Sequence, residues 1–312
     1  MSAKTDTGLQ RFAHSVFSPE TLQLMESWWR TPVVTDRSAF NRIPSKNESI
    51  KYREPGVETL ESLALPPLPG SSLPSWMRGK DGSLAVVKPC LVTDVLEGEQ
   101  FLIGASEAIA STLARHVGVL VAPVQVWKLG RDERPEDYYT ASLRILSDAR
   151  AKPPEPVLAN NLVTLARLGS FDTWINNPDR SLENIIYGSA WQSSTQVSAP
   201  PQTVIAGIDH GFRQNDPKKT YPILRHDLSG SKFVSATLWQ QVRAEITASP
   251  KVKSVITAIQ STPDAVIKDA VTTLPDALFP HPAGEAKAKR VDALKYRRDH
   301  IEALTMTAAG LT

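Results

Sequence analysis

The sequence predicts an α+β fold with two lobes, in which a small antiparallel β-sheet lobe is followed by a larger, mostly helical lobe. In residues 76–152, short apolar runs of strand length alternate with turn signals around one helical pattern. In residues 153–312, apolar residues recur at helical spacing, interrupted by one predicted hairpin. Pro-Pro-Glu-Pro at 153–156 marks the boundary between the lobes, and residues 1–75 are expected to form a helical segment and a Pro-rich linker.

The composition limits the class of protein. The chain has 312 residues, 41% of them hydrophobic, with 35 basic and 33 acidic residues and a formal charge of +2. Such a balance does not favour a nucleic-acid partner. The single cysteine, Cys90, rules out an internal disulfide and suits a reducing compartment. No apolar run is long enough to span a bilayer, and the first residues lack the apolar core of a signal peptide, so we expect a soluble cytoplasmic protein without a membrane partner.

Two helical patterns are predicted in residues 9–29. In the second, Ser18-Pro19-Glu20 is typical of a helix start, and Trp28 and Trp29 follow on the helix. These tryptophans are expected to pack on the main body or on a partner. Residues 31–75 are interpreted as irregular, and LPPLPGSSLPSW within them as a surface linker, with a polyproline ligand as the alternative.

The run GKDGSLAVVKP at residues 79–89 predicts a β-hairpin with Asp81-Gly82 in its turn. Gly79, Gly82 and Ser83 could offer backbone N–H groups to a phosphate, and Lys88, at the end of the second strand, could reach the phosphates of a nucleotide. The Ser83 hydroxyl is a possible site of self-modification. The alternative is a plain surface hairpin with a solvated lysine.

A helix predicted over residues 106–116 begins with a carboxylate that could hold Lys88. Glu107 lies in its first turn, where it could either pair with Lys88 or complement the helix dipole. Glu97 and Glu99, in the preceding loop, are competing candidates. Residues 121–129 and 138–146 then read as two strands, and backbone groups at 143–146, including those of Leu143 and Ile145, are expected to meet an adenine ring.

The stretch from 171 to 211, which begins FDTWINNPDRSLENIIYG and ends TVIAGIDHG, is the central prediction. A helix over 161–174 leads into a loop with Asp179 and Asn184 five residues apart, and two short strands then end at Asp209. Phosphoryl transfer needs a carboxylate near the attacking hydroxyl and oxygen ligands for Mg²⁺. We therefore interpret Asp179 as the catalytic base and Asn184 and Asp209 as metal ligands. The alternative is an ordinary turn, in which Arg180 ties down a nearby carboxylate.

These residues resemble a known family. NNPDRSLENIIY and IDHG, together with VVKP and SEAIASTLARHVGVLVAPV, are similar to the HipA-like kinases, especially their compact HipA-related branch. The resemblance covers residues 79–211 and extends to the carboxy-terminal helices only as a helical pattern. It implies a two-lobed, protein-kinase-like fold that uses ATP and Mg²⁺ to phosphorylate Ser or Thr in a protein substrate.

Carried over by position, the resemblance implies that Lys88 binds the phosphates and that Glu107 orients Lys88. It also implies that Asp179 is the catalytic base and that Asn184 and Asp209 bind Mg²⁺. Ser181 stands where the family commonly has His. Some members are toxins held by an antitoxin, so a regulatory protein partner is a further expectation. Two alternatives remain open, namely a kinase for a lipid or small molecule, and a nucleotide-binding pseudokinase that serves as an interaction scaffold.

Overall fold

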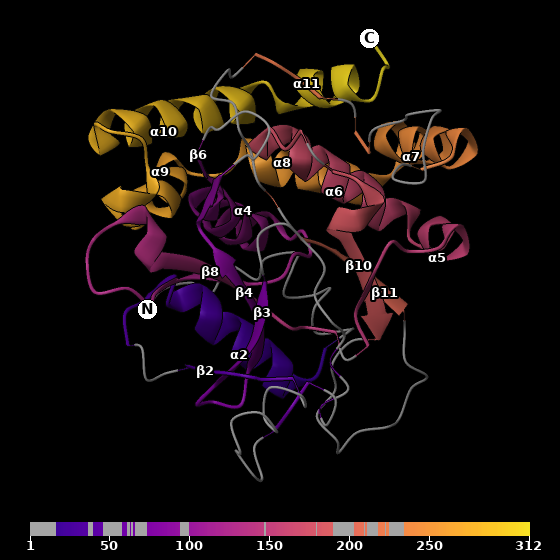
Figure 1. Cartoon of the computed structure of the whole chain (residues 1–312). Helices are drawn as coiled ribbons and strands as arrows, with labels where there is room; N and C mark the ends of the chain where they lie inside the picture. Colours follow the sequence, from indigo (N-terminus) through magenta and orange to yellow (C-terminus); the bar gives the residue numbers. More distant parts are fainter. Residues whose placement is uncertain are drawn as a thin grey trace, which may run out of the picture.

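The computed structural model has the two predicted lobes, with a β-sheet lobe packed against a larger helical lobe (Figure 1). The structure describes residues 17–36, 40–45, 58–60, 63, 65, 74–93, 100–146, 148–178, 180–189, 203–208, 210, 218–221, 223–224 and 234–312. The predicted α+β class is therefore confirmed, and the strands and helices lie close to their expected places in the chain.

Six strands form the main sheet in the order β1-β7-β8-β4-β3-β2. Neighbouring strands are antiparallel except for β1 and β7, which run parallel. The strands are β1 Val33–Val34, β2 Phe40–Arg42, β3 Ser75–Gly79, β4 Leu84–Pro89, β7 Val124–Lys128 and β8 Tyr138–Leu143. A two-stranded ribbon, β5 (Leu91–Thr93) and β6 (Gln100–Leu102), and the short 3₁₀ helix η2 (Pro135–Asp137) complete the strand connections of this lobe.

The sheet extends further toward the amino terminus than the sequence predicted. Strands β1 and β2 come from residues 31–75, which we interpreted as an irregular linker. Each is only two or three residues long and lies at an edge of the sheet, so neither shows the alternation that identifies a longer strand. The proline-rich residues 66–73 lie outside the described part of the chain.

Helix α2 (Pro19–Arg30) packs on one face of this sheet, and the Ser18 side chain caps it by accepting the Thr21 N–H. Met25 and Trp28 are buried against the sheet together with Trp127 of β7, and the rings of the two tryptophans lie 5.9 Å apart. The packing of this helix on the main body is thereby confirmed. The first predicted helical pattern lies almost entirely outside the described residues.

Helix α4 (Ile103–Val117) packs on the opposite face of the sheet and also contacts helices of the second lobe. Its inward residues belong to one apolar core that continues into that lobe. The second lobe consists of α5 Glu155–Ala159, α6 Leu162–Ile175, α7 Ala236–Ala248, α8 Pro250–Gln260, α9 Asp264–Thr272, η4 Asp276–Leu278, α10 Ala283–Asp299 and α11 Ile301–Ala308. Figure 1 shows α6 and α8 side by side at the centre of this lobe.

A second sheet has three strands, one that precedes α6 in the chain and two that follow it. Its order is β11-β10-β9, with β9 Arg150–Ala151, β10 Ile185–Ser189 and β11 Thr203–Gly207, and η3 Leu182–Asn184 leads into β10. The predicted hairpin is thus present, and its two strands pair from Ile185 opposite Gly207 to Ser189 opposite Thr203. Val204 and Ala206 of β11 share an apolar cluster with Ala85 and Val87 of β4, so the hairpin packs against the sheet lobe.

The packing of α2 predicts a measurable loss of stability when its buried face is truncated. Met25→Ala removes a side chain with 0% exposure and should lower the free energy of unfolding by about 2 to 5 kcal/mol. The measurement is equilibrium unfolding in urea. Ser27→Ala, on the exposed side of the same helix, is the control and should change stability by less than about 0.5 kcal/mol. Equal effects of the two substitutions would contradict the observed packing.

Candidate active site

The pairing of Lys88 with Glu107 is confirmed. Lys88 Nζ lies 2.6 Å from Glu107 Oε1. Lys88 stands opposite Thr140 in the β4–β8 register and, because successive strand residues alternate, faces away from Val87 and toward α4. The side chain of Glu107 is 2% exposed and that of Lys88 is 14% exposed, so the carboxylate is enclosed while part of the lysine remains accessible. Glu97 and Glu99 lie outside the described residues.

Cys90 fixes the start of α4 relative to the end of β4. Its side chain has 0% exposure, and a Cβ placed on Gly104 would lie 2.2 Å from its sulfur. Only glycine therefore allows this approach. Burial, and then the nearby Glu107 carboxylate, raise the pKa of the Cys90 thiol well above its usual range, so the sulfur stays neutral and packs as an apolar atom.

The predicted phosphate contacts of the β3–β4 turn are not supported. Gly79 donates its N–H to Ser83 O, Gly82 donates to Gly79 O, and Ser83 donates to the Asp81 carboxylate, so all three groups are engaged within the turn. Ser83 is also five residues from Lys88 along a strand, roughly 17 Å at the usual rise. The turn therefore lies at the end of the hairpin away from Lys88. The Ser83 hydroxyl is buried and donates to Asp81, which argues against its modification.

The segment expected to meet adenine is tied into the protein at several points. Leu143 donates its N–H to Pro123 O at 2.9 Å, and Arg144 donates its N–H to Leu84 O at 2.8 Å. The Leu143 and Ile145 side chains are both buried. Leu143 therefore has no free N–H to offer an adenine ring, which corrects that part of the prediction. The role of Ile145 stays a prediction.

Helix α6 ends where the predicted catalytic loop begins. Asn176 takes the left-handed conformation (φ 58°, ψ 46°) that commonly ends a helix, and its N–H bonds back to the helix. Asn177 then turns toward the helix again, donating its N–H to Asp172 O and its side-chain amide to the Asp172 carboxylate. Asp179, the proposed base, lies outside the described residues. Its neighbour Arg180 is described, so the course of the loop on both sides of Asp179 is defined.

One of the two predicted metal ligands, Asn184, lies at the described end of the hairpin. The Ile208 N–H donates to Asn184 O at 3.1 Å, which continues the β10–β11 ladder by one pair. Asn184 is half-buried at this end of the hairpin. Asp209 itself lies outside the described residues, and in the sequence it directly follows Ile208.

A buried ion pair holds this region together. Arg180 Nε lies 2.8 Å from Asp172 Oδ2, and Arg180 Nη2 lies 2.9 Å from Asp172 Oδ1. The same guanidinium contacts His210 Nδ1 at 2.8 Å and donates to Ile208 O at 2.6 Å and to Asn184 O. The side chains of Asp172, Arg180 and His210 are 5%, 2% and 2% exposed. We call these three residues the buried arginine cluster.

The charge states of the cluster follow from its geometry. Burial alone would raise the pKa of Asp172, but the charge and hydrogen bonds of Arg180 outweigh burial and lower that pKa to about 2. Burial, and then the Arg180 charge, lower the pKa of His210, so its ring is neutral at pH 7. Because Arg180 donates to Nδ1, that nitrogen is an acceptor and the proton lies on Nε2. Gly207 leaves space for the ring, since a Cβ there would lie 3.0 Å from His210 Cε1.

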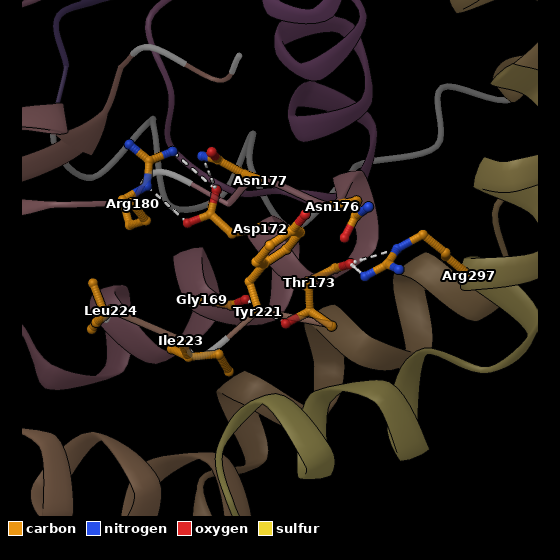
Figure 2. A pocket seen from close by; sticks show the side chains of 10 residues that line it. All are labelled: Gly169, Asp172, Thr173, Asn176, Asn177, Arg180, Tyr221, Ile223, Leu224 and Arg297. Atoms are coloured by element: carbon orange, nitrogen blue, oxygen red, sulfur yellow. Dashed lines mark hydrogen bonds and ion pairs between the residues drawn. The ribbon is translucent and has the colours of Figure 1, made fainter. Parts of the chain in front are cut away.

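A second buried arginine bonds the end of α6. Arg297 of α10 bonds the carbonyl groups of Thr173 and Trp174 at the end of α6, and also the carbonyl of Lys219. Figure 2 shows Arg297 reaching Thr173 on one side while Arg180 and Asn177 face Asp172 on the other. The cavity between them is about 10 Å³, room for about one water molecule and not for a substrate.

Sequence reasoning missed three of these residues, namely Asp172, His210 and Arg297. Asp172 carried a detectable signal, because it is an acidic residue inside an otherwise apolar helical run. Arg297 carried none, since it lies in KYRRDH, which resembles an exposed basic face. The sequence predicts Arg180 only as a turn residue that ties down a nearby carboxylate. The structure has that contact, to Asp172, and also the contacts of Arg180 with the hairpin carbonyl groups.

These elements form a two-lobed, kinase-like α+β fold. They are the sheet lobe with its Lys88–Glu107 pair, the helical lobe, and the hairpin that packs against the sheet lobe. The sequence matches no protein-family model and no curated protein. Among solved structures, one of the Golgi casein kinase with Mn/ADP bound has a TM-score of 0.45 and 14% identity, covering 85% of this chain and 77% of that chain. Another crystal structure of the Golgi casein kinase has a TM-score of 0.46 and 13% identity, covering 98% of this chain and 80% of that one. The functional argument therefore rests on the residues of this chain.

Two kinds of feature are absent from the described residues. No helix in the described ranges combines the length and apolar character needed to cross a lipid bilayer. Within the same part of the chain, no three His, Cys, Asp or Glu side chains are grouped as metal ligands. This statement does not cover Asp179 and Asp209, because both lie outside the described residues.

The low pKa of Asp172 predicts how stability depends on pH. A carboxylate with a folded-state pKa of about 2 and an unfolded-state value near 3.8 contributes stability above pH 4, and that contribution is lost as the pH falls toward 2. The loss attributable to Asp172 should be about 2 kcal/mol. Urea unfolding at pH 6, 4 and 2.5 should therefore show a smaller acid-induced loss in Asp172→Asn than in the wild-type protein.

At pH 6 the same Asp172→Asn variant should be less stable than the wild-type protein by about 3 to 5 kcal/mol, because Arg180 would stay buried without its counter-ion. Asp264→Asn is the control. Its carboxylate is 59% exposed beside Arg298, and an exposed pair contributes little to stability. An acid profile of Asp172→Asn that overlays the wild-type profile would refute the charge assignment.

Proposed function

We propose that the protein is a kinase that transfers the γ-phosphoryl group of ATP to a hydroxyl of a protein Ser or Thr, in the manner of the HipA-like kinases it resembles. The observation that carries the proposal is the 2.6 Å ion pair between Lys88 on a strand and Glu107 on the helix beneath it. In kinases a strand lysine held by a helix glutamate contacts the nucleotide phosphates. Glu107 is enclosed and Lys88 is partly accessible, as such a role requires.

The residue types also suit a nucleotide with Mg²⁺. Amide and carboxylate oxygens are ligands that Mg²⁺ prefers, and the end of the β10–β11 hairpin brings Asn184 next to the residue before Asp209. Asn184 and Asp209 would hold the metal, and Lys88 would hold the phosphates. When bound, Mg²⁺ would neutralise the charge of the phosphates. The Lys88 and Asp179 assignments follow the family resemblance and the order of these residues in the chain.

In the proposed reaction the substrate hydroxyl oxygen forms a bond to the γ-phosphorus, and the bond from that phosphorus to the β–γ bridging oxygen breaks. ADP is the leaving group. Asp179 accepts the hydroxyl proton and returns it to solvent. Glu107 takes no part in the bond changes and keeps the Lys88 ammonium in place through their ion pair at 2.6 Å.

Lys88→Met should lower transfer of labelled phosphate from ATP about 100-fold or more, because it removes a charge aimed at the phosphates. Asp179→Asn and Asp209→Asn should lower transfer comparably. Lys80→Met is the matched control, since Lys80 lies exposed in the turn at the other end of the same hairpin and its loss should leave transfer nearly unchanged. Thermal unfolding verifies that each variant is folded.

The products distinguish the alternatives. After incubation with labelled ATP and a mixed protein substrate, acid hydrolysis should yield phosphoserine or phosphothreonine. Label found only in lipid or small molecules would instead favour a lipid or small-molecule kinase. If the wild-type protein binds nucleotide but transfers no phosphate, the pseudokinase alternative would be favoured. Equal transfer by the wild-type, Lys88→Met and Asp179→Asn proteins would disprove the proposed function.

A further inference from the structure

The buried arginine cluster is one peptide bond from each of two residues proposed to carry the chemistry. Arg180 directly follows Asp179, and His210 directly follows Asp209. The third proposed residue, Asn184, is bonded to the cluster through its own carbonyl oxygen. Arg180 and Asn184 lie in one segment and His210 lies in another, about 25 residues later in the chain. The relative placement of the two segments therefore depends on contacts between them.

Arg180 makes that connection with its planar guanidinium. Nε and Nη2 bind the two oxygens of Asp172 at 2.8 and 2.9 Å, which fixes the plane of the group relative to helix α6. Nη1 then donates to the carbonyl oxygens of Asn184 and Ile208, one on each side of the hairpin end. A lysine has no comparable set of directed donors and could not serve all of these acceptors at once.

His210 adds a second connection on the Asp209 side. Its Nδ1 lies 2.8 Å from Arg180 Nη2, and its ring packs edge-on against Phe171 at a centroid distance of 6.0 Å. The residue after Asp209 is therefore held both by Arg180 and by helix α6. Phe171 is adjacent to Asp172, so one turn of α6 contacts both segments of the proposed site.

Stability alone gives no reason for this arrangement. A buried ion pair contributes little net stability compared with an apolar group of the same size, because both charges must leave water. A bidentate pair does, however, define geometry well. We infer that the buried arginine cluster is the positioning element of the proposed phosphoryl-transfer site, and that Asp172 and His210 act through Arg180 to hold Asn184 and Ile208 at the end of the hairpin. This inference rests on the proposed function.

The inference is tested by the concentration of Mn²⁺ that gives half-maximal binding of a fluorescent ADP analogue to the full chain. Asp172→Asn and Arg180→Lys should raise that concentration about tenfold or more, the usual effect of losing a residue that orients metal ligands. The matched control is Arg297→Lys, which alters another arginine that is 2% exposed and bonds the end of α6 but contacts neither Asn184, Ile208 nor His210. It should lower the melting temperature and leave the Mn²⁺ requirement within about twofold of wild type.

A conservative pair at position 210 separates positioning from packing. His210→Asn keeps an acceptor for Arg180 and should restore most of the Mn²⁺ affinity that His210→Ala loses. The inference is overturned if the folded Asp172→Asn and Arg180→Lys variants need no more Mn²⁺ than Arg297→Lys, or if the two position-210 variants behave alike. Failure of the wild-type protein itself to bind the ADP analogue with Mn²⁺ would instead refute the proposed function, and the inference with it.

Discussion

The arrangement of the candidate site depends on the buried ion pair between Asp172 and Arg180. Neither charge could be buried alone, because an isolated ion in the protein interior costs several kcal/mol. Each is stabilised by the other at 2.8 to 2.9 Å, and the remaining donors of Arg180 satisfy main-chain oxygens of the hairpin. Arg180, in the loop after α6, is consequently joined both to α6 and to the end of β11, although these elements are distant in sequence.

The sheet lobe contributes a second ion pair, built on a different principle. Lys88 and Glu107 are placed by regular secondary structure, the first by strand alternation and the second by its turn of helix α4. The Gly104–Cys90 contact sets how closely that helix follows the strand. Backbone geometry thus positions Lys88, whereas side-chain hydrogen bonds position the loop of the helical lobe.

The sequence predicted the parts of the fold that depend on local patterns. Helix α6, the β10–β11 hairpin and the pairing of Lys88 with Glu107 all follow from periodicity, turn residues or chain order. It did not predict the edge strands β1 and β2, which are too short to show a period and exist because β7 and β3 offer them partners. The role of Arg297 was equally hidden, since two of its acceptors, the carbonyl groups of Thr173 and Trp174, lie more than 100 residues earlier in the chain. The phosphate contacts predicted for Gly79, Gly82 and Ser83 are not supported, because turn chemistry says nothing about which end of a hairpin approaches a ligand.

The burial of helix α4 limits how far this helix can move. It is buried along most of its length, with the sheet on one side and helices α8 and α9 on the other. Rotating it outward would expose apolar surface from both lobes at once, at about 25 cal/mol for each Å². Separating Glu107 from Lys88 by an outward movement of this helix would therefore be costly, so the packing of both lobes keeps the two side chains together.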